Sequence, residues 1–489
     1  MTSWSNMDRV GGDVPELSAA AAAEAISDDA TMTVSGFGSV GYPKAVPLAL
    51  ANSGRDLSLT VISGGSVGEE IDTALVESGA IARRFPYQST SIARDAVNTG
   101  NIALHDRHIG SLADEIVFEE LASPDVAVVE AVAVGEDWLI PTTSVGHTPA
   151  YVEQADNLVV EVNAVQPRNL ARFHDIYRPA MPPQREPIPL MGPGERIGDP
   201  KIRFDPEKLV GVVRTDHRDS PYSFRTPTDE DQAIAANFRS FLTDELERNP
   251  VFAETVRLQF GVGSLGNALM SELAADNFGD RSVSYYGEVI QDGLLDLLAD
   301  GDLTVASATT LALSAEGQDR LFENIDTFAE NVVLRPADVS NAAETIKRMG
   351  VFAVNSALEV DLYGHVNSTH VDGSHLINGI GGSNDYNRHA AVSVVALPST
   401  ASDGAISRVV PMAPHVDHTE HDVSAVITEQ GIADLRGLSP RERAVELIEN
   451  CAHPDYRAEL SRYYEQSRKQ GGHMPHDLSA AFDWTTGDS

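Results

Sequence analysis

TVRLQFGVGSLG at residues 255–266 and TMTVSGFGSVG at residues 31–41 share one pattern. In each stretch an apolar run rich in β-branched residues is followed by glycines spaced as GxGSxG. A segment with apolar residues at helical spacing comes next, NALMSELAADNFG (267–279) in one case and YPKAVPLALANSG (42–54) in the other. This order predicts a strand, a tight glycine turn and a helix. Because it occurs twice, it predicts two related halves.

Each half continues with a second strand, LSLTVIS (57–63) before Gly64 and Gly65, and SVSYY (282–286) before Gly287 and Glu288. The two stretches therefore read as the start of right-handed βαβ units. Further candidate strands begin at Val126, Asn157, Leu303, Val351, Ala390 and Val423. The predicted fold class is α/β, with two similar open α/β domains at residues 1–220 and 221–489.

The charge of the chain is strongly negative. Its 489 residues include 73 acidic and 35 basic side chains, which gives a formal net charge of −38. Nucleic acid is therefore excluded as an expected partner, since a polyanion would be repelled. Lysine is scarce and occurs only at Lys44, Lys201, Lys208, Lys347 and Lys469. The pattern is typical of a halophile protein, because such self-repulsion is tolerable where the Debye length falls to about 3 Å at 1 M salt; an ordinary acidic protein is the alternative.

The sequence contains no membrane or export signal. It has no apolar run of about 18 residues, and its N-terminus lacks a basic start followed by an apolar stretch. Cys451 is the only cysteine, so no intramolecular disulfide forms. We expect a cytoplasmic protein that binds no membrane.

The GxGSxG turns allow more than one interpretation. Glycines at this spacing before a helix favour a phosphate group at the helix N-terminus, as in an NAD-dependent dehydrogenase, and Glu288 follows the second copy at a distance that suits a ribose. Two observations oppose this interpretation: the motif occurs twice in equivalent places, and Glu288 continues as VIQDG (289–293), which a ribose-binding acid does not need. Simple tight turns are the remaining alternative.

A second glycine-rich segment, NSALEVDLYGHVNSTHVDGSHLINGIGGS, covers residues 355–383. Gly379, Gly381 and Gly382 predict a turn whose backbone N–H groups could stabilise an oxyanion, and glycine lets a substrate approach the chain closely. A plain hairpin turn is the alternative.

Three histidines, His365, His370 and His375, recur in the same segment. Regular spacing alone suggests metal ligands. No cysteine lies near them and no HExxH motif is present, so we predict no metal site.

Motifs throughout the chain carry a family resemblance. In the second half these are GEVIQDGLLDLL (287–298), RPADVSN (335–341), NSALEVDLYGHVNSTH (355–370), NGIGGSNDYNRHA (378–390) and TEQGIADLRGLSPRERA (428–444). In the first half they are ISGGSVGEEIDTAL (62–75), GAIARRFPYQS (79–89) and IPTTSVGHTPAYVEQADNLVVEVNAVQP (140–167). Together they resemble the acetyl-CoA hydrolase/transferase family of class I CoA-transferases, with the NagB/RpiA-like fold, and above all the succinyl-CoA:acetate CoA-transferases. The resemblance covers residues 30–465 in order.

The resemblance implies that Glu288 is the catalytic nucleophile, which attacks an acyl-CoA thioester and ends as a glutamyl-CoA thioester. It further implies that Asn341 contacts the catalytic carboxylate, that the Gly382 amide is an oxyanion donor, and that Glu429 lies beside the carboxylate substrate. A carboxylate nucleophile is suited to exchange between activated acyl groups of similar energy.

The same resemblance implies a CoA-binding set of Gly263, Ser264, Leu265, Gly266, Asn267, Leu358, Asn378 and Gly382. It implies acyl-CoA and small carboxylates as the substrates, no tightly bound cofactor, and a homodimer. Three functions stay open at this point: a CoA-transferase of the acetyl-CoA, succinyl-CoA or propionyl-CoA class, an acetyl-CoA hydrolase, and an NAD-dependent dehydrogenase.

Overall fold

The chain forms two compact units in the computed structural model: unit 1 is Met1–Ser223 with Tyr285–Met349, and unit 2 is Phe224–Ser284 with Gly350–Ser489. The structure describes residue 4 and residues 7–273 and 278–482. The units are discontinuous in sequence, and the segment with Glu288 folds within unit 1. The division into sequence domains at residues 220 and 221 stays a prediction.

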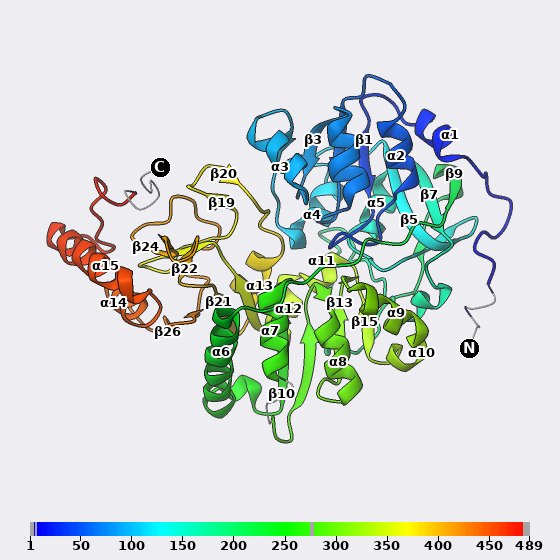
Figure 1. The fold of residues 1–489 in the computed structure, drawn as a ribbon. Helices are drawn as coiled ribbons and strands as arrows, with labels where there is room; N and C mark the ends of the chain where they lie inside the picture. Colours follow the sequence, from blue (N-terminus) through cyan, green and yellow to red (C-terminus); the bar gives the residue numbers. More distant parts are fainter. Residues whose placement is uncertain (1–3, 5–6, 274–277, 483–489) are drawn as a thin grey trace. The chain divides into compact units, whose positions relative to one another are not determined.

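Unit 1 is built on a largely parallel sheet with the order β4-β3-β2-β1-β5-β7-β9, to which β6 and β8 add an antiparallel branch on β5 (Figure 1). The central strands β5 and β7 are near-continuous apolar runs and almost entirely buried, as expected for parallel strands covered on both faces. The strands are β1 (Thr31–Val34), β2 (Leu59–Ile62), β3 (Ile81–Phe85), β4 (Ala103–Leu104), β5 (Val126–Val134), β6 (Trp138–Pro141), β7 (Asn157–Asn163), β8 (Ile202–Arg203) and β9 (Leu209–Thr215).

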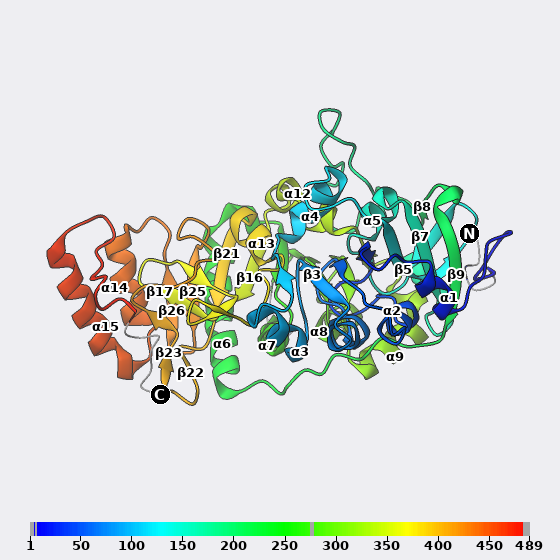
Figure 2. The same cartoon turned by 90° about the horizontal axis from the view of Figure 1, so that it is seen from above.

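Helices pack on this sheet through small and branched apolar residues. Ala22 and Ala23 of α1 and Val46 and Leu50 of α2 join one core cluster with the strands, and α1 and α2 lie side by side in both views (Figures 1 and 2). The helices are α1 (Ala19–Glu24), α2 (Ala45–Ala51), α3 (Ser91–Asn98), α4 (Ile109–Val117) and α5 (Thr148–Gln154), with the π-helix η2 (Glu70–Leu75) and the 3-10 helices η3 (Arg168–Arg172) and η4 (Pro206–Lys208).

The segment Tyr285–Met349 completes unit 1 with two short parallel pairs, β12 with β14 and β13 with β15. Its elements are β12 (Val289–Ile290), α8 (Asp292–Asp300), β13 (Val305–Ala308), β14 (Thr310–Leu311), α9 (Ala315–Glu323), α10 (Ile325–Phe328), β15 (Val332–Leu334), α11 (Ala337–Ser340) and α12 (Ala343–Met349).

Unit 2 contains a second sheet in which β10, β16, β21 and β25 run parallel and β26 is antiparallel. Phe238 of α6 meets the rings of Phe260 and Phe352 edge-on, which anchors that helix on the sheet. The main strands are β10 (Thr255–Phe260), β16 (Phe352–Ser356), β21 (Val392–Ala396), β25 (Ala425–Thr428) and β26 (Gly431–Asp434). The strand β11 (Ser282–Tyr286) begins in unit 2, and its last two residues belong to unit 1.

Helix α6 begins with a capping box between Thr228 and Asp231, and α14 and α15 lie together beside β26 (Figure 2). The helices are α6 (Asp229–Arg248), η5 (Pro250–Phe252), α7 (Ser264–Leu273), α13 (Ser383–His389), α14 (Pro440–Asn450), α15 (Pro454–Ser467) and η6 (Arg468–Gln470). Short ribbons complete the unit: β17 (Glu359–Asp361), β18 (Val366–Asn367), β19 (His370–Val371), β20 (His375–Leu376), β22 (Thr400–Ala401), β23 (Ile406–Ser407) and β24 (Val409–Val410).

The predicted α/β class is confirmed, as are both strand-turn-helix repeats. Two helix bounds differ from the prediction. Helix α2 begins only at Ala45, because Tyr42 and Lys44 make buried contacts before it. Helix α7 begins at Ser264, and part of its predicted range, 274–277, lies outside the described residues. In the described part of the chain, no helix is both long and apolar enough to cross a membrane.

Candidate active site

Glu288 follows Gly287 and directly precedes β12 in unit 1. Its carbonyl accepts hydrogen bonds from the backbone N–H groups of Thr309 (2.9 Å) and Thr310 (3.2 Å). A Cβ atom at Gly287 would lie 2.3 Å from the hydroxyl of Tyr285, so only glycine fits there. The Glu288 backbone is therefore fixed, while its side chain is only half-buried and stays accessible.

The buried side chain of Asn341 contacts this carboxylate. Asn341 caps the C-terminal end of α11, its own N–H donates to the Ala337 carbonyl at 2.8 Å, and its Nδ2 donates to Glu288 Oε1 at 2.8 Å. A donor of this kind favours the charged carboxylate and fixes its orientation. The structure thus brings Glu288 and Asn341 together, while their catalytic roles stay predictions.

We expect Asn341→Ala to lower kcat on the order of 10²-fold, because one oriented donor to the reacting carboxylate is lost. The KM for acetyl-CoA should change little, since Glu288 itself is retained. Steady-state kinetics with purified variants would test this, with Asn101→Ala, an exposed asparagine of the same unit, as the matched control. A wild-type kcat in Asn341→Ala would remove Asn341 from the catalytic step.

Segments from the first half of the chain also surround Glu288 within unit 1. Phe37 of the first GxGSxG turn packs in a cluster with Val289, and its carbonyl accepts a hydrogen bond from Thr310 Oγ1 at 2.9 Å. Val145 N–H donates to the Thr309 carbonyl at 2.9 Å, and Gly146 N–H to Thr309 Oγ1 at 3.0 Å. Sequence reasoning did not assign these contacts, although residues 140–167 carried part of the resemblance.

Gly382 lies in unit 2 at the start of α13, where it is the buried N-cap residue. Gly381 before it has a φ of +57°, which favours glycine. The turn is closed by Ser383, whose hydroxyl donates to the Ile380 carbonyl at 2.8 Å. The predicted oxyanion turn is therefore an ordered backbone turn and no hairpin.

His418, which is buried, supports this turn and was not identified from the sequence. Its Nε2 lies 3.3 Å from Ser383 Oγ and 3.4 Å from Ser368 Oγ, and its Nδ1 lies 3.2 Å from Asn384 Nδ2. In the tautomer whose Nδ1 accepts from the Asn384 amide, the Nε2–H faces the two serine hydroxyls. The dense histidines of residues 415–421 were the available signal.

Glu429 is a partly buried carboxylate at the end of β25 in unit 2. Burial acts to raise its pKa, but hydrogen bonds outweigh that effect and the pKa of Glu429 is lowered. The donors are the Ser399 N–H at 2.7 Å, the Ser399 hydroxyl, and Gln430 Nε2 at 2.9 Å. Glu429 is therefore held as an ionised, oriented carboxylate.

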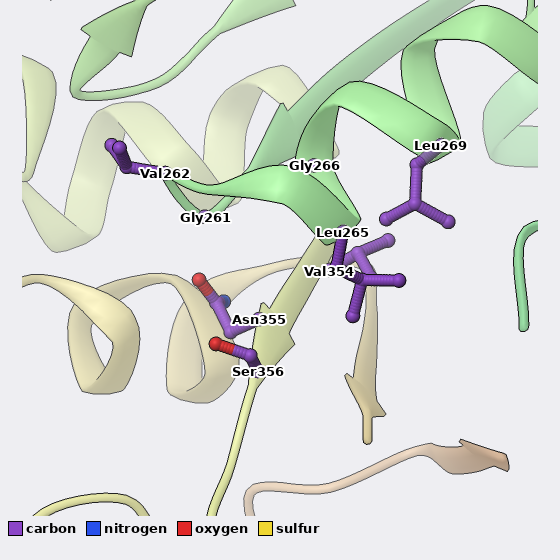
Figure 3. A pocket seen from close by; sticks show the side chains of 8 residues that line it. All are labelled: Gly261, Val262, Leu265, Gly266, Leu269, Val354, Asn355 and Ser356. Atoms are coloured by element: carbon purple, nitrogen blue, oxygen red, sulfur yellow. The ribbon is translucent and has the colours of Figure 1, made fainter. Parts of the chain in front are cut away.

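The second GxGSxG turn lines an open pocket of unit 2. Figure 3 shows apolar side chains, among them Leu265 and Val354, on one side and the polar Asn355 and Ser356 on the other. The full lining is Gly261, Val262, Leu265, Gly266, Leu269, Val354, Asn355 and Ser356.

Asn355 connects the pocket to α13. Its side chain exchanges hydrogen bonds with Gln259 (3.1 and 3.3 Å) and donates to Asn387 Oδ1 at 2.9 Å. Asn387 belongs to α13, the helix that Gly382 begins. The pocket and the Gly382 turn are therefore parts of one connected polar layer in unit 2.

Other residues predicted to bind CoA lie near this layer without lining the pocket. Asn378 Nδ2 donates to the Ser368 carbonyl at 3.4 Å, and Leu358 N–H donates to the Asn367 carbonyl at 2.8 Å. Gly263 has a φ of +136° with open space at its Cβ position, and Asn267 follows it in α7.

The three histidines of residues 365–375 do not converge. His365 pairs with Asp361 and Glu420, each at 2.9 Å, and the hydrogen bond that Asp361 accepts from its ring raises the pKa of His365. The His370 ring instead lies tilted against the His415 ring, with 4.0 Å between the ring centroids. Across the described residues, no group of three or more His, Cys, Asp or Glu side chains is arranged to hold a metal ion.

Comparison with known proteins gives relatives along almost the whole chain. Sequence models of the acetyl-CoA hydrolase/transferase N-terminal and C-terminal domains match residues 15–214 and 317–464. A succinyl-CoA:acetate CoA-transferase of Clostridium kluyveri is 42% identical over 96% of this chain and 88% of its own length. A propanoyl-CoA:succinate CoA transferase of Escherichia coli is 40% identical over 96% of each chain. An acetyl-CoA hydrolase of Yarrowia lipolytica is 38% identical over 92% of this chain and 90% of its own.

Solved structures share the fold at low sequence identity. RipA from Yersinia pestis has a TM-score of 0.71 and 21% identity, covering 92% of this chain and 97% of its own. A 4-hydroxybutyrate CoA-transferase from Porphyromonas gingivalis has a TM-score of 0.63 and 21% identity over 94% and 98%. These likenesses show the fold, and the sequence matches establish that the chain is an enzyme of the acetyl-CoA hydrolase/transferase family.

Proposed function

We propose that this enzyme transfers CoA between acyl-CoA and small carboxylates through a glutamyl-CoA thioester on Glu288. The observation that carries the proposal is the accessible Glu288 carboxylate, fixed through its backbone and held by the buried Asn341 at 2.8 Å. In such a site the carboxylate is oriented before the substrate arrives, which lowers the entropic cost of attack.

The proposed chemistry balances without a cofactor. A Glu288 oxygen attacks the thioester carbonyl, the C–S bond breaks, and CoA leaves as a thiolate while an acyl-glutamyl anhydride remains. The thiolate then attacks the glutamyl carbonyl and releases the carboxylate of the first acyl group. A second carboxylate reverses both steps, so the CoA group ends on a new acid. CoA thioesters act as substrates, and no tightly bound cofactor takes part.

The remaining roles follow the same proposal. The Gly382 amide stabilises the oxyanion, Glu429 lies beside the incoming carboxylate, and CoA binds along the second GxGSxG turn. The CoA-binding residues are Gly263, Ser264, Leu265, Gly266, Asn267, Leu358, Asn378 and Gly382. Support comes from the pocket at this turn and from its link through Asn355 to α13.

Hydrolysis of acetyl-CoA is the second candidate, favoured by relatives that carry that name at 38% identity. The two activities share Glu288 and differ in whether water or a carboxylate takes the acyl-enzyme onward. Transfer is the better supported, because the relatives named CoA-transferases are 42% and 40% identical to this chain and those named acetyl-CoA hydrolases 38%. We also propose a cytoplasmic homodimer, in line with the acidic composition and the family.

Following free CoA and new acyl-CoA together, with and without acetate, propionate or succinate, distinguishes the two activities. We expect new thioester to form only with an acceptor and free CoA to accumulate at less than about a tenth of that rate, since a closed site excludes water. CoA release at one rate with or without acceptor, and without new thioester, would identify a hydrolase.

A further inference from the structure

The first GxGSxG turn, residues 36–41, packs against other segments of the chain, whereas Gly263 of the second copy faces open space. A Cβ atom at Gly36 would lie 2.7 Å from Tyr42 Cβ, and one at Gly41 would lie 2.7 Å from Ser144 Cβ. At Gly263 of the second copy no atom lies within 4 Å. The glycines of the first copy therefore allow close packing of chain segments, a need that ligand binding does not explain.

Three backbone N–H groups of this turn already have protein partners. Phe37 N–H donates to the Val40 carbonyl at 3.2 Å, and Ser39 N–H to the Ser66 carbonyl at 2.9 Å. Gly41 N–H donates to Oδ1 of Asp219 at 3.1 Å. A phosphate would have to displace these acceptors, one of them a buried carboxylate that repels it.

Asp219 belongs to a buried group of charged residues. Lys44 Nζ lies 2.7 Å from Glu130 and 2.9 Å from Asp219, and all three side chains are at most 2% exposed. Burial opposes the charge of Lys44, but the two carboxylates raise its pKa, so it remains a cation. Glu130 also accepts a hydrogen bond from Thr142 Oγ1 at 2.7 Å. One lysine thus faces two carboxylates in the interior of unit 1.

Asp219 binds both chain segments that hold the Glu288 turn. Its Oδ1 accepts from Gly41, and its Oδ2 accepts from Thr143 Oγ1 at 2.8 Å. The Thr143 carbonyl in turn accepts from Leu311 N–H at 3.0 Å, while the carbonyl of Phe37, in the Gly41 turn, accepts from Thr310 Oγ1 at 2.9 Å. Thr310 and Leu311 form β14, which pairs with the strand that follows Glu288.

We propose that Asp219 is a positioning residue for the nucleophile Glu288. Asp219 holds the first GxGSxG turn in place, and this turn supports the Glu288 turn. The inference rests on the proposed role of Glu288. The two copies of the repeat then have different roles, since the second copy binds the CoA substrate and the first holds the carboxylate that reacts with it.

The charge distribution favours this role over simple stabilisation. Buried ion pairs contribute little net stability, because desolvation offsets their attraction, and an excess buried carboxylate is unfavourable. Asp219→Asn leaves Lys44 and Glu130 as a balanced pair and keeps the shape of the side chain. Gln166, whose Nε2 donates to Asp219 Oδ2 at 3.0 Å, can turn its amide to suit the new side chain. The variant should therefore fold.

The test compares Asp219→Asn with the wild-type protein in molar KCl. We expect the rate of adduct formation on Glu288 from acetyl-CoA, followed by mass spectrometry, to fall on the order of 10- to 100-fold, as for a misplacement of about 1 Å. The KM for acetyl-CoA should stay within about twofold of the wild-type value, because the substitution removes no contact to the bound substrate. Glu245→Gln, a buried carboxylate paired with Arg436 in unit 2, is the control and should keep the wild-type adduct rate.

A second variant keeps the inference testable if Asp219→Asn does not fold. Thr143→Val removes one hydrogen bond to Asp219, and Thr33→Val removes a hydroxyl buried in β1 as its control. Only the first should slow the adduct, by about three- to tenfold. Adduct formation at the wild-type rate in Asp219→Asn, or in Thr143→Val if the former does not fold, would overturn the inference. If the wild-type protein forms no adduct, the proposed function fails instead, and an unchanged kcat in the same variant would then overturn the inference.

Discussion

Glu288→Ala is expected to slow CoA transfer on the order of 10⁴-fold or more, because the variant lacks the carboxyl group on which both proposed covalent intermediates form. Folding should be little affected. The side chain is only half-buried, and the bonds that fix the turn come from the backbone of Thr309 and Thr310. Melting curves should therefore agree with the wild type within a few degrees, which separates lost chemistry from lost structure.

The wild-type protein should gain the mass of CoA on the peptide with Glu288 when incubated with acetyl-CoA and no acceptor. Borohydride should then reduce the thioester and inactivate the enzyme. Glu153→Ala, which removes a half-exposed glutamate paired with Arg178 in the same unit, is the matched control and should retain both adduct and activity. Full transfer activity in Glu288→Ala would exclude the proposed mechanism.

The melting temperature is expected to rise on the order of 10 °C or more between about 0.1 M and 2 M KCl. The formal net charge of −38 makes the folded chain repel itself, and molar salt screens this repulsion. Exposed ion pairs such as Arg203–Asp137 would change stability in the opposite direction on screening, but such pairs contribute little. Activity should follow the folded fraction.

Two controls separate screening from other effects of salt. Sucrose stabilises proteins by exclusion and screens no charge, so it should not replace KCl. Asp244→Asn with Glu247→Gln, two exposed carboxylates of α6, should lower the salt concentration needed. A melting temperature that does not change between the two KCl concentrations would contradict the halophile interpretation.

Local sequence patterns predicted most of the fold because its strands are buried apolar runs bounded by glycine. The bounds of β7, β10 and β11 agree with those predicted, since β-branched and aromatic residues end there at clear turns. The starts of helices were harder to predict. The sequence around Lys44 has helical spacing of its apolar residues, but Lys44 forms buried ion pairs with Glu130 and Asp219 and lies outside the helix. Such a contact depends on Asp219, far along the chain, and leaves no periodic signal.

The family motifs were enough to predict the residues of the candidate site that belong to those motifs. The residues that support the site through contacts with other segments could not be predicted in this way. Glu288 and Asn341 were identified from motifs, and the structure adds the distance between them. His418 and Asp219 act through neighbours from distant segments, so no local pattern marks them. The membership of Tyr285–Met349 in unit 1 is of the same kind, because it follows from packing of Phe37 and Ile109 against Val289 and Ala337.

That discontinuity affects how the chain can fold during synthesis. When a ribosome has released residues 1–223, the surface that receives β12 and β14 is still uncovered, and the apolar side chains of Phe37 and Ile109 have no partners from the later segment. The first unit can close only after residue 349 has emerged, with much of α6, β10 and α7 already made in between. Long-range closure of this kind slows folding and exposes apolar surface to aggregation. An enzyme cut between residues 220 and 221 would therefore separate Glu288 from the chain segments of unit 1 that pack around it.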